Sequence, residues 1–141
     1  MSDFAYRFAT PEDTQFIERS WHESLWKTTY MGHKDLQWDD YKSGQDLLIK
    51  RILSKVRPVA LCYKPTPDLL LGYIVVENDT LHWCYVKNIY RRQHVATALL
   101  KTFPQVKQYS QKVRRNGAKW LSHINLKYNP YTLMELPCPI P

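Results

Sequence analysis

The stretch VKNIYRRQHVATALL, residues 86–100, carries the clearest local signal in this sequence. Two adjacent arginines, Arg91 and Arg92, precede an apolar run without proline or glycine, and this run predicts a helix over residues 95–103. A helix N-terminus presents unpaired amide donors and a partial positive charge, to which nearby arginines add. The stretch therefore predicts an anion-binding turn at the start of a helix.

The composition predicts a folded, basic chain. Its 141 residues fit one domain, and 44% hydrophobic with 13% aromatic residues exclude a disordered chain. The formal net charge of +7 favours an anionic partner, such as nucleic acid, a membrane surface or a polyphosphate ligand. Charge alone does not choose among these partners.

The cysteines and the apolar runs indicate the compartment. Cys62, Cys84 and Cys138 form an odd set in which no pair has metal-ligand spacing, so we expect reduced thiols and no metal. The N-terminus has no apolar signal core, and the longest apolar run, residues 69–76, is too short to span a bilayer. A soluble, cytoplasmic protein without membrane association is expected.

Capping signals and helical spacing organise the N-terminal part. A strand is predicted at residues 4–9, and the next helix begins with Thr10 as N-cap, Pro11 and an acidic pair. Apolar residues at every fourth position predict about four turns for this helix: Ile17, Trp21 and Leu25. A second helix is predicted over residues 35–55, and Gly44 leaves open whether it forms one piece or two.

Three strands are predicted in the middle of the chain. Two prolines in residues 64–68 cannot both take part in a sheet ladder, so this segment is predicted as a turn. Asn78 and Asp79 predict a tight hairpin. The strands themselves are predicted at residues 58–63, 69–77 and 80–87.

The C-terminal part follows from proline and glycine positions. Pro104 kinks the helix, which is predicted to continue over residues 105–115 and to stop at Asn116 and Gly117. A last strand is predicted at residues 119–124, followed by an extended proline-rich tail. We expect one domain over residues 1–125, with residues 126–141 packed on it or trailing from it.

The quoted stretch resembles motif A of the GNAT acetyltransferases, approximately V-x-P-x-Y-R-x-x-G-x-G/A-T/S-A-L-L. The matching residues are Val86, Tyr90, Arg91, Ala96, Thr97, Ala98, Leu99 and Leu100. Residues 69–86, with Gly72, look like the family's hairpin of strands three and four, and residues 6–17 look like its first strand and helix start. The resemblance covers about residues 3–125. It implies an α/β GNAT-like acyl-CoA N-acyltransferase fold with a mixed sheet, abbreviated at the C-terminus.

The sequence departs from the family pattern at several places. His94 stands where the family has glycine, and Asn88 stands where proline is common. The family continues with a helix and two further strands, and that helix commonly carries an asparagine and a tyrosine that protonates the departing thiolate. The segment LKYNPYTLMELPCPIP replaces this unit, with Asn129, Tyr128 and Tyr131 as candidate remnants.

The resemblance implies acetyl-coenzyme A as acyl donor. Its pyrophosphate would bind backbone amides at the helix start, where a positive helix end favours anions. The main chain of residues 83–86 would hold the pantetheine arm and polarise the thioester carbonyl. The implied cofactor-binding residues are Tyr85, Val86, Arg91, Arg92, Gln93, His94, Val95, Ala96 and Thr97.

Transfer to an amine also requires proton transfer. Glu77 and His82 are the candidate bases, although an exposed turn carboxylate and a packed strand histidine are the simpler interpretations of the two. Tyr128 and Tyr131 are the candidate acids. The aromatic residues in the region where the family shapes its acceptor pocket are expected mostly in the core: Trp21, Trp26, Tyr30 and Trp38.

Three functions are compatible with these observations. The first is an N-acetyltransferase acting on a small-molecule or protein amine. The second is a catalytically silent GNAT-like domain that binds coenzyme A or a partner, suggested by His94 and the short C-terminus. The third is nucleic-acid binding or modification, for which no motif accompanies the basic residues Lys101, Lys107, Lys112, Arg114, Arg115 and Lys119. The sequence identifies neither the acceptor nor the oligomeric state, and a homodimer is compatible with it.

Overall fold

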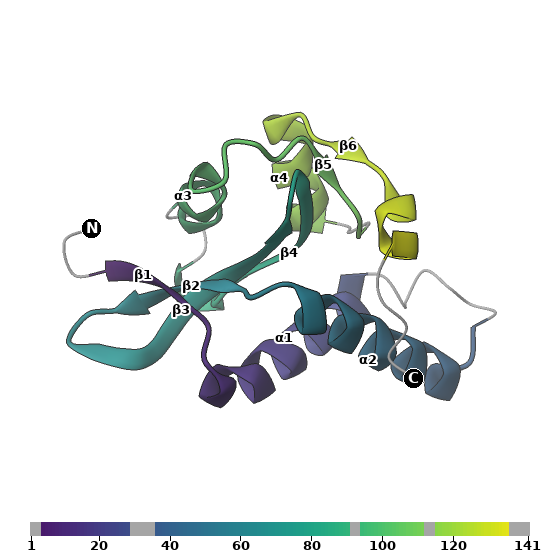
Figure 1. Ribbon diagram of the computed structural model, residues 1–141, viewed down its shortest axis with the longest axis horizontal. Coiled ribbons are helices and arrows are strands. Elements are labelled where there is room, and N and C mark those ends of the chain that lie inside the picture. The colour runs from purple at the N-terminus through teal and green to yellow at the C-terminus, as the bar shows by residue number, and fades with distance from the viewer. Residues whose placement is uncertain (1–3, 29–35, 91–93, 112–114, 136–141) are drawn as a thin grey trace.

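A computed structural model describes residues 4–28, 36–90, 94–111 and 115–135. Figure 1 shows its helices and strands. The strands are β1 (Phe4–Phe8), β2 (Val59–Tyr63), β3 (Thr66–Glu77), β4 (Thr80–Val86), β5 (Gln108–Tyr109) and β6 (Lys127–Tyr128). The helices are α1 (Thr14–Thr28), α2 (Trp38–Lys55), α3 (Val95–Lys101) and α4 (Arg115–Ile124), with 3-10 turns η1 (Pro11–Asp13), η3 (Asn88–Tyr90) and η4 (Pro130–Glu135).

One mixed sheet with helices on both faces forms the molecule. The strands lie in sequence order, antiparallel from β1 to β4 and parallel from β4 to β6. Helices α1 and α2 cover one face, and α3 and α4 cover the other (Figure 1). This arrangement confirms the mixed α/β architecture expected from the sequence.

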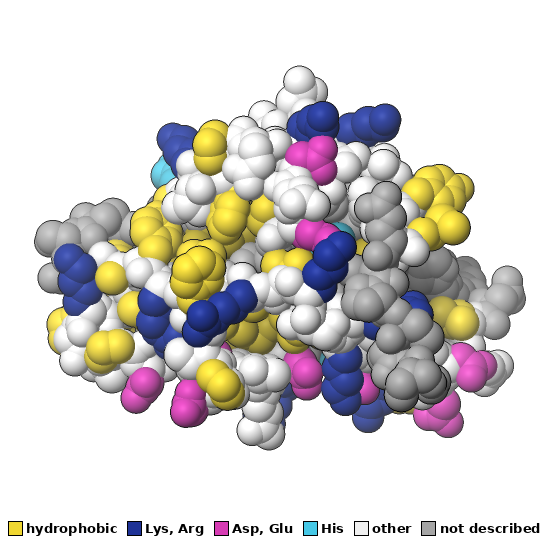
Figure 2. Space-filling view, in the orientation of Figure 1, with side chains coloured by type: hydrophobic (Ala, Val, Ile, Leu, Met, Phe, Trp, Pro, Cys, Tyr) yellow, Lys and Arg dark blue, Asp and Glu magenta, His cyan; other side chains and the backbone are white. Residues whose placement is uncertain are grey.

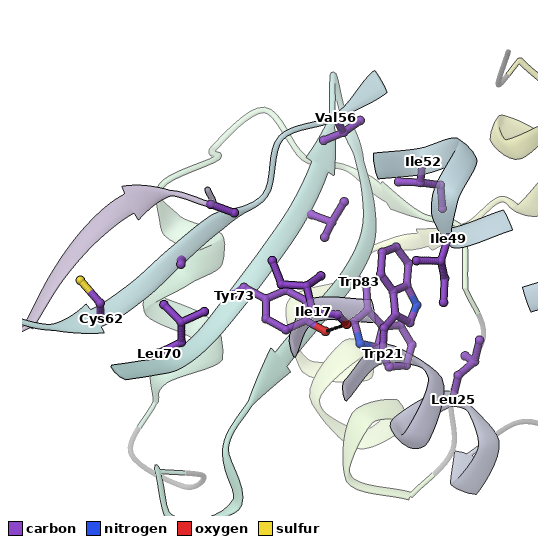
Figure 3. Packing of buried hydrophobic residues seen from close by; sticks show 13 residues of the cluster. Ile17, Trp21, Leu25, Ile49, Ile52, Val56, Cys62, Leu70, Tyr73 and Trp83 are labelled. Atoms are coloured by element: carbon purple, nitrogen blue, oxygen red, sulfur yellow. Dashed lines mark hydrogen bonds between the residues drawn. The ribbon is translucent and has the colours of Figure 1, made fainter. Parts of the chain in front are cut away.

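The core under α1 and α2 is aromatic. The fourth-position stripe of α1 is fully buried, as predicted, and Trp21 stacks on Trp83 of β4 with ring centroids 5.9 Å apart (Figure 3). Tyr73 is buried in the same layer and donates its hydroxyl to the carbonyl of Ile17 at 3.0 Å. Because an unpaired buried hydroxyl is costly, this bond fixes how α1 sits on β3.

The start of α1 is held by Asp13. Its carboxylate accepts hydrogen bonds from the Thr10 backbone amide at 2.8 Å and from Arg7 of β1 at 2.6 Å and 3.1 Å. The Arg7 guanidinium therefore holds the Asp13 pKa below its ordinary value, with the Thr10 bonds acting in the same direction. This confirms Thr10 as N-cap, and it ties the helix start to the first strand.

Helix α2 is one piece. The sequence allowed a break at Gly44, but the helix runs unbroken through it and begins at Trp38. Gly44 is exposed, while Tyr41, Ile49 and Ile52 are buried against the core. Packing of that face outweighs the low helix propensity of one exposed glycine.

The predicted five-residue turn at residues 64–68 is wrong. The turn comprises only Lys64 and Pro65, and β3 already begins at Thr66. Proline is tolerated here because the β2–β3 ladder is irregular. Tyr63 pairs with Thr66 and Cys62 with Leu70, so residues 67–69 of β3 have no partner on β2.

The predictions for residues 105–124 are also wrong. The chain after Pro104 does not continue as a helix but runs to strand β5, and the predicted strand at 119–124 is helix α4. Gly117, Trp120, Leu121 and Ile124 have the i, i+3, i+4, i+7 spacing of a helix face, and Leu121 is buried against α3 and the sheet. Asn116 and Gly117 thus lie in the first turn of a helix instead of after its end.

The segment after α4 is not an extended tail throughout. Lys127 donates its amide to the Lys107 carbonyl at 3.1 Å and Asn129 to that of Tyr109 at 2.8 Å, which adds β6 to the sheet. A helix and one further strand therefore follow β5 in the described residues, where the resemblance implied a helix and two strands. The domain boundary at residue 125 stays a prediction.

The surface mixes charged and apolar groups. On the face in Figure 2, lysine and arginine side chains are scattered among acidic and hydrophobic ones. None of the helices in the described ranges is long and apolar enough to cross a membrane.

Replacing Asp13 by alanine is expected to lower the free energy of unfolding at neutral pH by about 2 kcal/mol, because charge-assisted hydrogen bonds are lost. Since the folded pKa lies below the unfolded value of 3.8, this stabilisation is present above that value and disappears as pH falls through the folded pKa. Urea titrations at several pH values measure it. Glu12→Gln, at the neighbouring exposed position, is the control, and an equal loss in both variants would contradict the assignment.

Gly72 and Gly44 differ in the space available for a side chain, so alanine substitutions at the two positions should have opposite effects on stability. A Cβ on Gly72 would lie 2.5 Å from the Tyr85 carbonyl oxygen on β4, whereas a Cβ on Gly44 meets nothing within 4 Å. Gly72→Ala should lower the free energy of unfolding by about 1–3 kcal/mol through overpacking. Gly44→Ala should raise it by about 1 kcal/mol. Chemical denaturation checks both, and a neutral Gly72→Ala would show that β3 and β4 have room to separate.

Candidate active site

Strand β4 has two neighbours of unequal length. Its ladder with β3 runs from Thr80 to Val86, but its parallel ladder with β5 comprises only Thr80 with Gln108 and Leu81 with Tyr109. The Ser110 amide donates to the Leu81 carbonyl at 3.1 Å. In the described residues no strand pairs with this edge of β4 beyond Leu81, so the two strands part within the sheet.

The open edge of β4 can be assigned by alternation. The Lys87 amide donates to the Leu71 carbonyl at 2.8 Å, and Tyr85 pairs with Tyr73 two residues earlier. In an antiparallel ladder, residues between such hydrogen-bonded pairs direct their backbone groups away from the partner strand. The amide and carbonyl groups of Cys84 and Val86 therefore face the edge that β5 leaves.

A register shift in β4 occurs next to this edge. Trp83 pairs with Val75 and Leu81 with Val76, so His82 is an extra residue in the ladder. Such a bulge changes the direction of the side chains around it. Here it places the His82 side chain between Glu77 of β3 and Ser110 after β5.

These residues form a chain of polar contacts. His82 Nδ1 lies 2.7 Å from Ser110 Oγ, and His82 Nε2 lies 2.9 Å from Glu77 Oε1. Glu77 Oε2 pairs with Lys55 Nζ at 2.5 Å, at the end of α2. His82 and Ser110 are buried, Glu77 is largely covered, and the Lys55 side chain is 42% exposed, so only one end of the chain reaches solvent.

The charges determine how the imidazole is protonated. Burial acts to raise the Glu77 pKa, but the bonds from His82 and Lys55 together hold it below its ordinary value. Burial lowers the His82 pKa, against the opposing effect of Glu77. Because an ionised carboxylate only accepts, the neutral imidazole carries its proton on Nε2, and its bare Nδ1 accepts from the Ser110 hydroxyl.

The structure brings two of the sequence-derived catalytic candidates together and leaves two apart. Glu77 and His82 are in contact, so Glu77 is not an exposed turn carboxylate. Tyr128 packs its ring on Tyr109, at 5.3 Å between centroids, in the layer of α3 and α4. Tyr131 is 72% exposed in η4. Neither tyrosine is hydrogen-bonded to His82, whose ring nitrogens contact Ser110 and Glu77.

The turn before α3 is only partly described. Arg91, Arg92 and Gln93 lie outside the described residues. His94 follows with φ 58° and ψ 24°, the left-handed conformation in which glycine is least strained, and its side chain is exposed. Thr97 Oγ1 accepts a hydrogen bond from Trp120 Nε1 of α4 at 3.2 Å.

The other residues that the resemblance implies for coenzyme binding pack on the core. Val86 and Val95 are buried, and Ala96 is half-buried against the α3–α4 layer. Tyr85 stacks on Tyr73 with centroids 5.6 Å apart.

The aromatic residues suggested for an acceptor pocket divide into two groups. Trp21 is a core residue, as expected, whereas Trp38 is exposed and stacks on Tyr41 at 5.8 Å. Tyr30 and the side chain of Trp26 lie outside the described residues.

A cavity of about 340 Å³ lies elsewhere, between the start of α1 and the end of α2. It meets the polar chain only through Lys55, and its lining includes Thr10, Thr14 and Arg57. Within the described ranges, no group of three His, Cys, Asp or Glu side chains could hold a metal ion. The chemistry available at the parting strands is therefore that of a carboxylate, an imidazole and a hydroxyl.

The sequence did not identify Lys55 and Ser110. Ser110 falls within the helix that was predicted over residues 105–115, and Lys55 is the last residue of the helix predicted over residues 35–55. Pro104, which lies three residues after the end of α3, was the available signal for a strand over residues 108–109, because a strand conventionally follows a helix in an α/β chain.

Solved structures resemble this fold, and two of the three given next are described as acetyltransferases. A GCN5-related N-acetyltransferase from Rhodopseudomonas palustris aligns with a TM-score of 0.56 at 17% identity, over 88% of this chain and 81% of that chain. A possible acetyltransferase from Clostridium difficile 630 aligns with a TM-score of 0.54 at 14% identity, over 98% and 93%. Apo YjaB from Escherichia coli aligns with a TM-score of 0.51 at 15% identity, over 70% of this chain and 63% of that chain.

These likenesses establish the fold. The chain spans less than two thirds of YjaB, and no family model and no curated protein sequence matches it. The fold of the GNAT acetyltransferases, implied by the motif resemblance, is thereby confirmed.

The protonation scheme can be checked by ¹⁵N NMR of the histidine side chains. The His82 pKa is expected below 6.5, with the proton of the neutral ring on Nε2. Glu77→Gln should lower this pKa further, because the negative charge that favours imidazolium is removed. Asp79→Asn, which removes a nearby carboxylate without a contact to His82, is the control. A His82 pKa at or above 6.5 in the native protein would contradict the scheme.

Proposed function

We propose that the protein is an N-acetyltransferase that transfers the acetyl group of acetyl-coenzyme A to a primary amine. The observation that carries the proposal is the buried Glu77–His82 pair at the point where β4 and β5 part. A base at that point is adjacent to the backbone edge on which the fold would receive an acyl donor. The motif resemblance and the fold support the same reaction class.

The reaction requires a base because amines are protonated near neutral pH. An ammonium has no lone pair, so it must lose a proton before it attacks the thioester carbonyl. Burial keeps His82 neutral, and Glu77 stabilises the imidazolium that forms when the ring accepts a proton. The pair therefore combines an unprotonated Nδ1, which accepts a hydrogen bond from Ser110, with a negative charge beside the other nitrogen.

The donor would be held by main-chain groups. The backbone groups of Cys84 and Val86 face the open edge of β4 and suit the amides of a pantetheine arm. The resemblance assigns the pyrophosphate to the turn of residues 91–97. Acetyl-coenzyme A supplies the acyl group as a thioester, and the residues of the chain bind it and remove the acceptor's proton.

The acid that protonates the leaving thiolate is assigned only by the resemblance. Tyr128 and Tyr131 remain the candidates for this role. Tyr128 has the more defined position, because its ring is fixed on Tyr109.

A silent coenzyme-binding domain is the second candidate. The strained left-handed conformation of His94 and the complete burial of His82 favour it, since both features restrict access of ligands. The two candidates differ in turnover and agree in coenzyme binding.

Release of coenzyme A from acetyl-coenzyme A tests the proposal. The amine panel contains an alanyl peptide, a lysine peptide, spermidine and glucosamine, with product masses recorded. At least one amine should be acetylated, and His82→Gln should lower that rate about 10²–10⁴-fold. His22→Gln, a half-buried histidine on α1 paired with Asp46, is the matched control. Binding without turnover would identify the silent domain, and absence of binding would exclude both candidates.

His94→Gly is expected to tighten acetyl-coenzyme A binding in calorimetry. Glycine has no Cβ to obstruct the backbone, and relief of the left-handed conformation should also raise the free energy of unfolding by about 1 kcal/mol. Asn125→Gly, at another left-handed residue with φ 60°, is the control and should leave binding unchanged. Clearly weaker binding by His94→Gly would show that the imidazole itself contacts the donor.

A further inference from the structure

Both ring nitrogens of His82 are already occupied. Nε2 is bonded to Glu77 at 2.9 Å and Nδ1 to Ser110 at 2.7 Å. His82 and Ser110 are both buried, with 1% and 2% of each residue exposed, so an acceptor must enter between the parting strands to reach either group. An acceptor amine therefore meets no lone pair of this imidazole directly. If His82 is the base, its proton must arrive through the group that occupies Nδ1.

Ser110 lies at the position such a group needs. It follows the last residue of β5, and its backbone N–H donates a hydrogen bond to the Leu81 carbonyl. Beyond Leu81, β4 continues without pairing with β5. The Ser110 hydroxyl is thus located where the strands begin to part. A serine hydroxyl both donates and accepts, so it can give its proton to Nδ1 while a lone pair receives another.

We propose that Ser110 is a further catalytic residue, which relays the proton of the acceptor ammonium to His82. The proposal rests on the proposed transferase function and specifies its proton path. In one step the acceptor N–H bond breaks and its proton goes to Ser110 Oγ, while the original hydroxyl proton goes to His82 Nδ1.

The remaining transfers balance the reaction. When the acyl transfer is complete, the Nδ1 proton returns through Ser110 Oγ to solvent, which restores the neutral ring with its proton on Nε2 beside Glu77. The freed amine attacks the thioester carbonyl, the C–S bond breaks, and the second amine proton ends on the coenzyme A thiol. The net products are an amide, free coenzyme A and one released proton.

The charged groups around the imidazole support this direction of transfer. Among the described residues, Glu77 from β3 and Lys55 from α2 are those that act electrostatically on His82. Glu77 favours arrival of a proton on the ring, and Lys55 disfavours its accumulation there. The same geometry would suit an acyl-accepting serine, but the backbone bond to Leu81 holds Ser110 in the sheet, and relay requires only a hydrogen bond.

The test compares Ser110→Ala, Ser110→Thr and the control Ser122→Ala, an exposed helix serine, with the native chain. Rates are measured from pH 6 to pH 10 with the panel amine that reacts fastest. Ser110→Ala should lose about 10²-fold at pH 7. Its rate should then rise about tenfold per pH unit up to the pKa of the amine, since only amine that is already neutral can react. The native enzyme, Ser110→Thr and Ser122→Ala should share one earlier plateau.

The outcomes separate the relay from the transferase function. Native turnover with an unchanged pH profile in Ser110→Ala overturns the relay alone, and so does an acetylated Ser110 found by mass spectrometry. Absence of native turnover overturns the function and the relay with it. A proton inventory on the native enzyme in mixed H₂O and D₂O needs no variant. A curved plot, from two protons moving together, supports the relay, and a linear plot overturns it.

Discussion

The unequal pairing of β4 is the constraint on which the rest of the structure depends. Six residues of this strand pair with β3, but only two pair with β5. The antiparallel side keeps β4 in place because its residues are packed between the two helical layers. The parallel side can then end early, which directs the backbone groups of Cys84 and Val86 at an edge with which no strand of the described residues pairs. Gly72 serves the same arrangement, since any side chain there would collide with the Tyr85 carbonyl.

The polar chain also depends on this geometry. A buried carboxylate without partners is strongly destabilising, so Glu77 can be covered only because Lys55 and His82 satisfy both of its oxygens. The extra residue in β4 turns His82 toward Ser110, which lies where β5 ends. Residues from α2, β3 and β4 and from the end of β5 therefore meet at one point, with solvent reached at the Lys55 end.

Much of the fold was predictable from local chemistry, and the site only in part. Thr10 and Pro11 marked the start of the first helix, and the stripe of Ile17, Trp21 and Leu25 is buried as its spacing required. The segment after Pro104 was not predictable in this way, because a two-residue strand has no period and Gly117 resembles a helix stop while lying inside α4. Glu77 and His82 were recognisable as titratable groups near a turn. Their contact with Ser110 was not, because it joins residues 28 positions apart across parallel strands.

The crystal structure of the chain with bound coenzyme A tests this account most directly. We expect the pantetheine amides to hydrogen-bond to the backbone of Cys84 and Val86 and the coenzyme A thiol to lie beside Ser110. Coenzyme bound in the cavity between α1 and α2, or a β5 strand paired with β4 beyond Leu81, would contradict it.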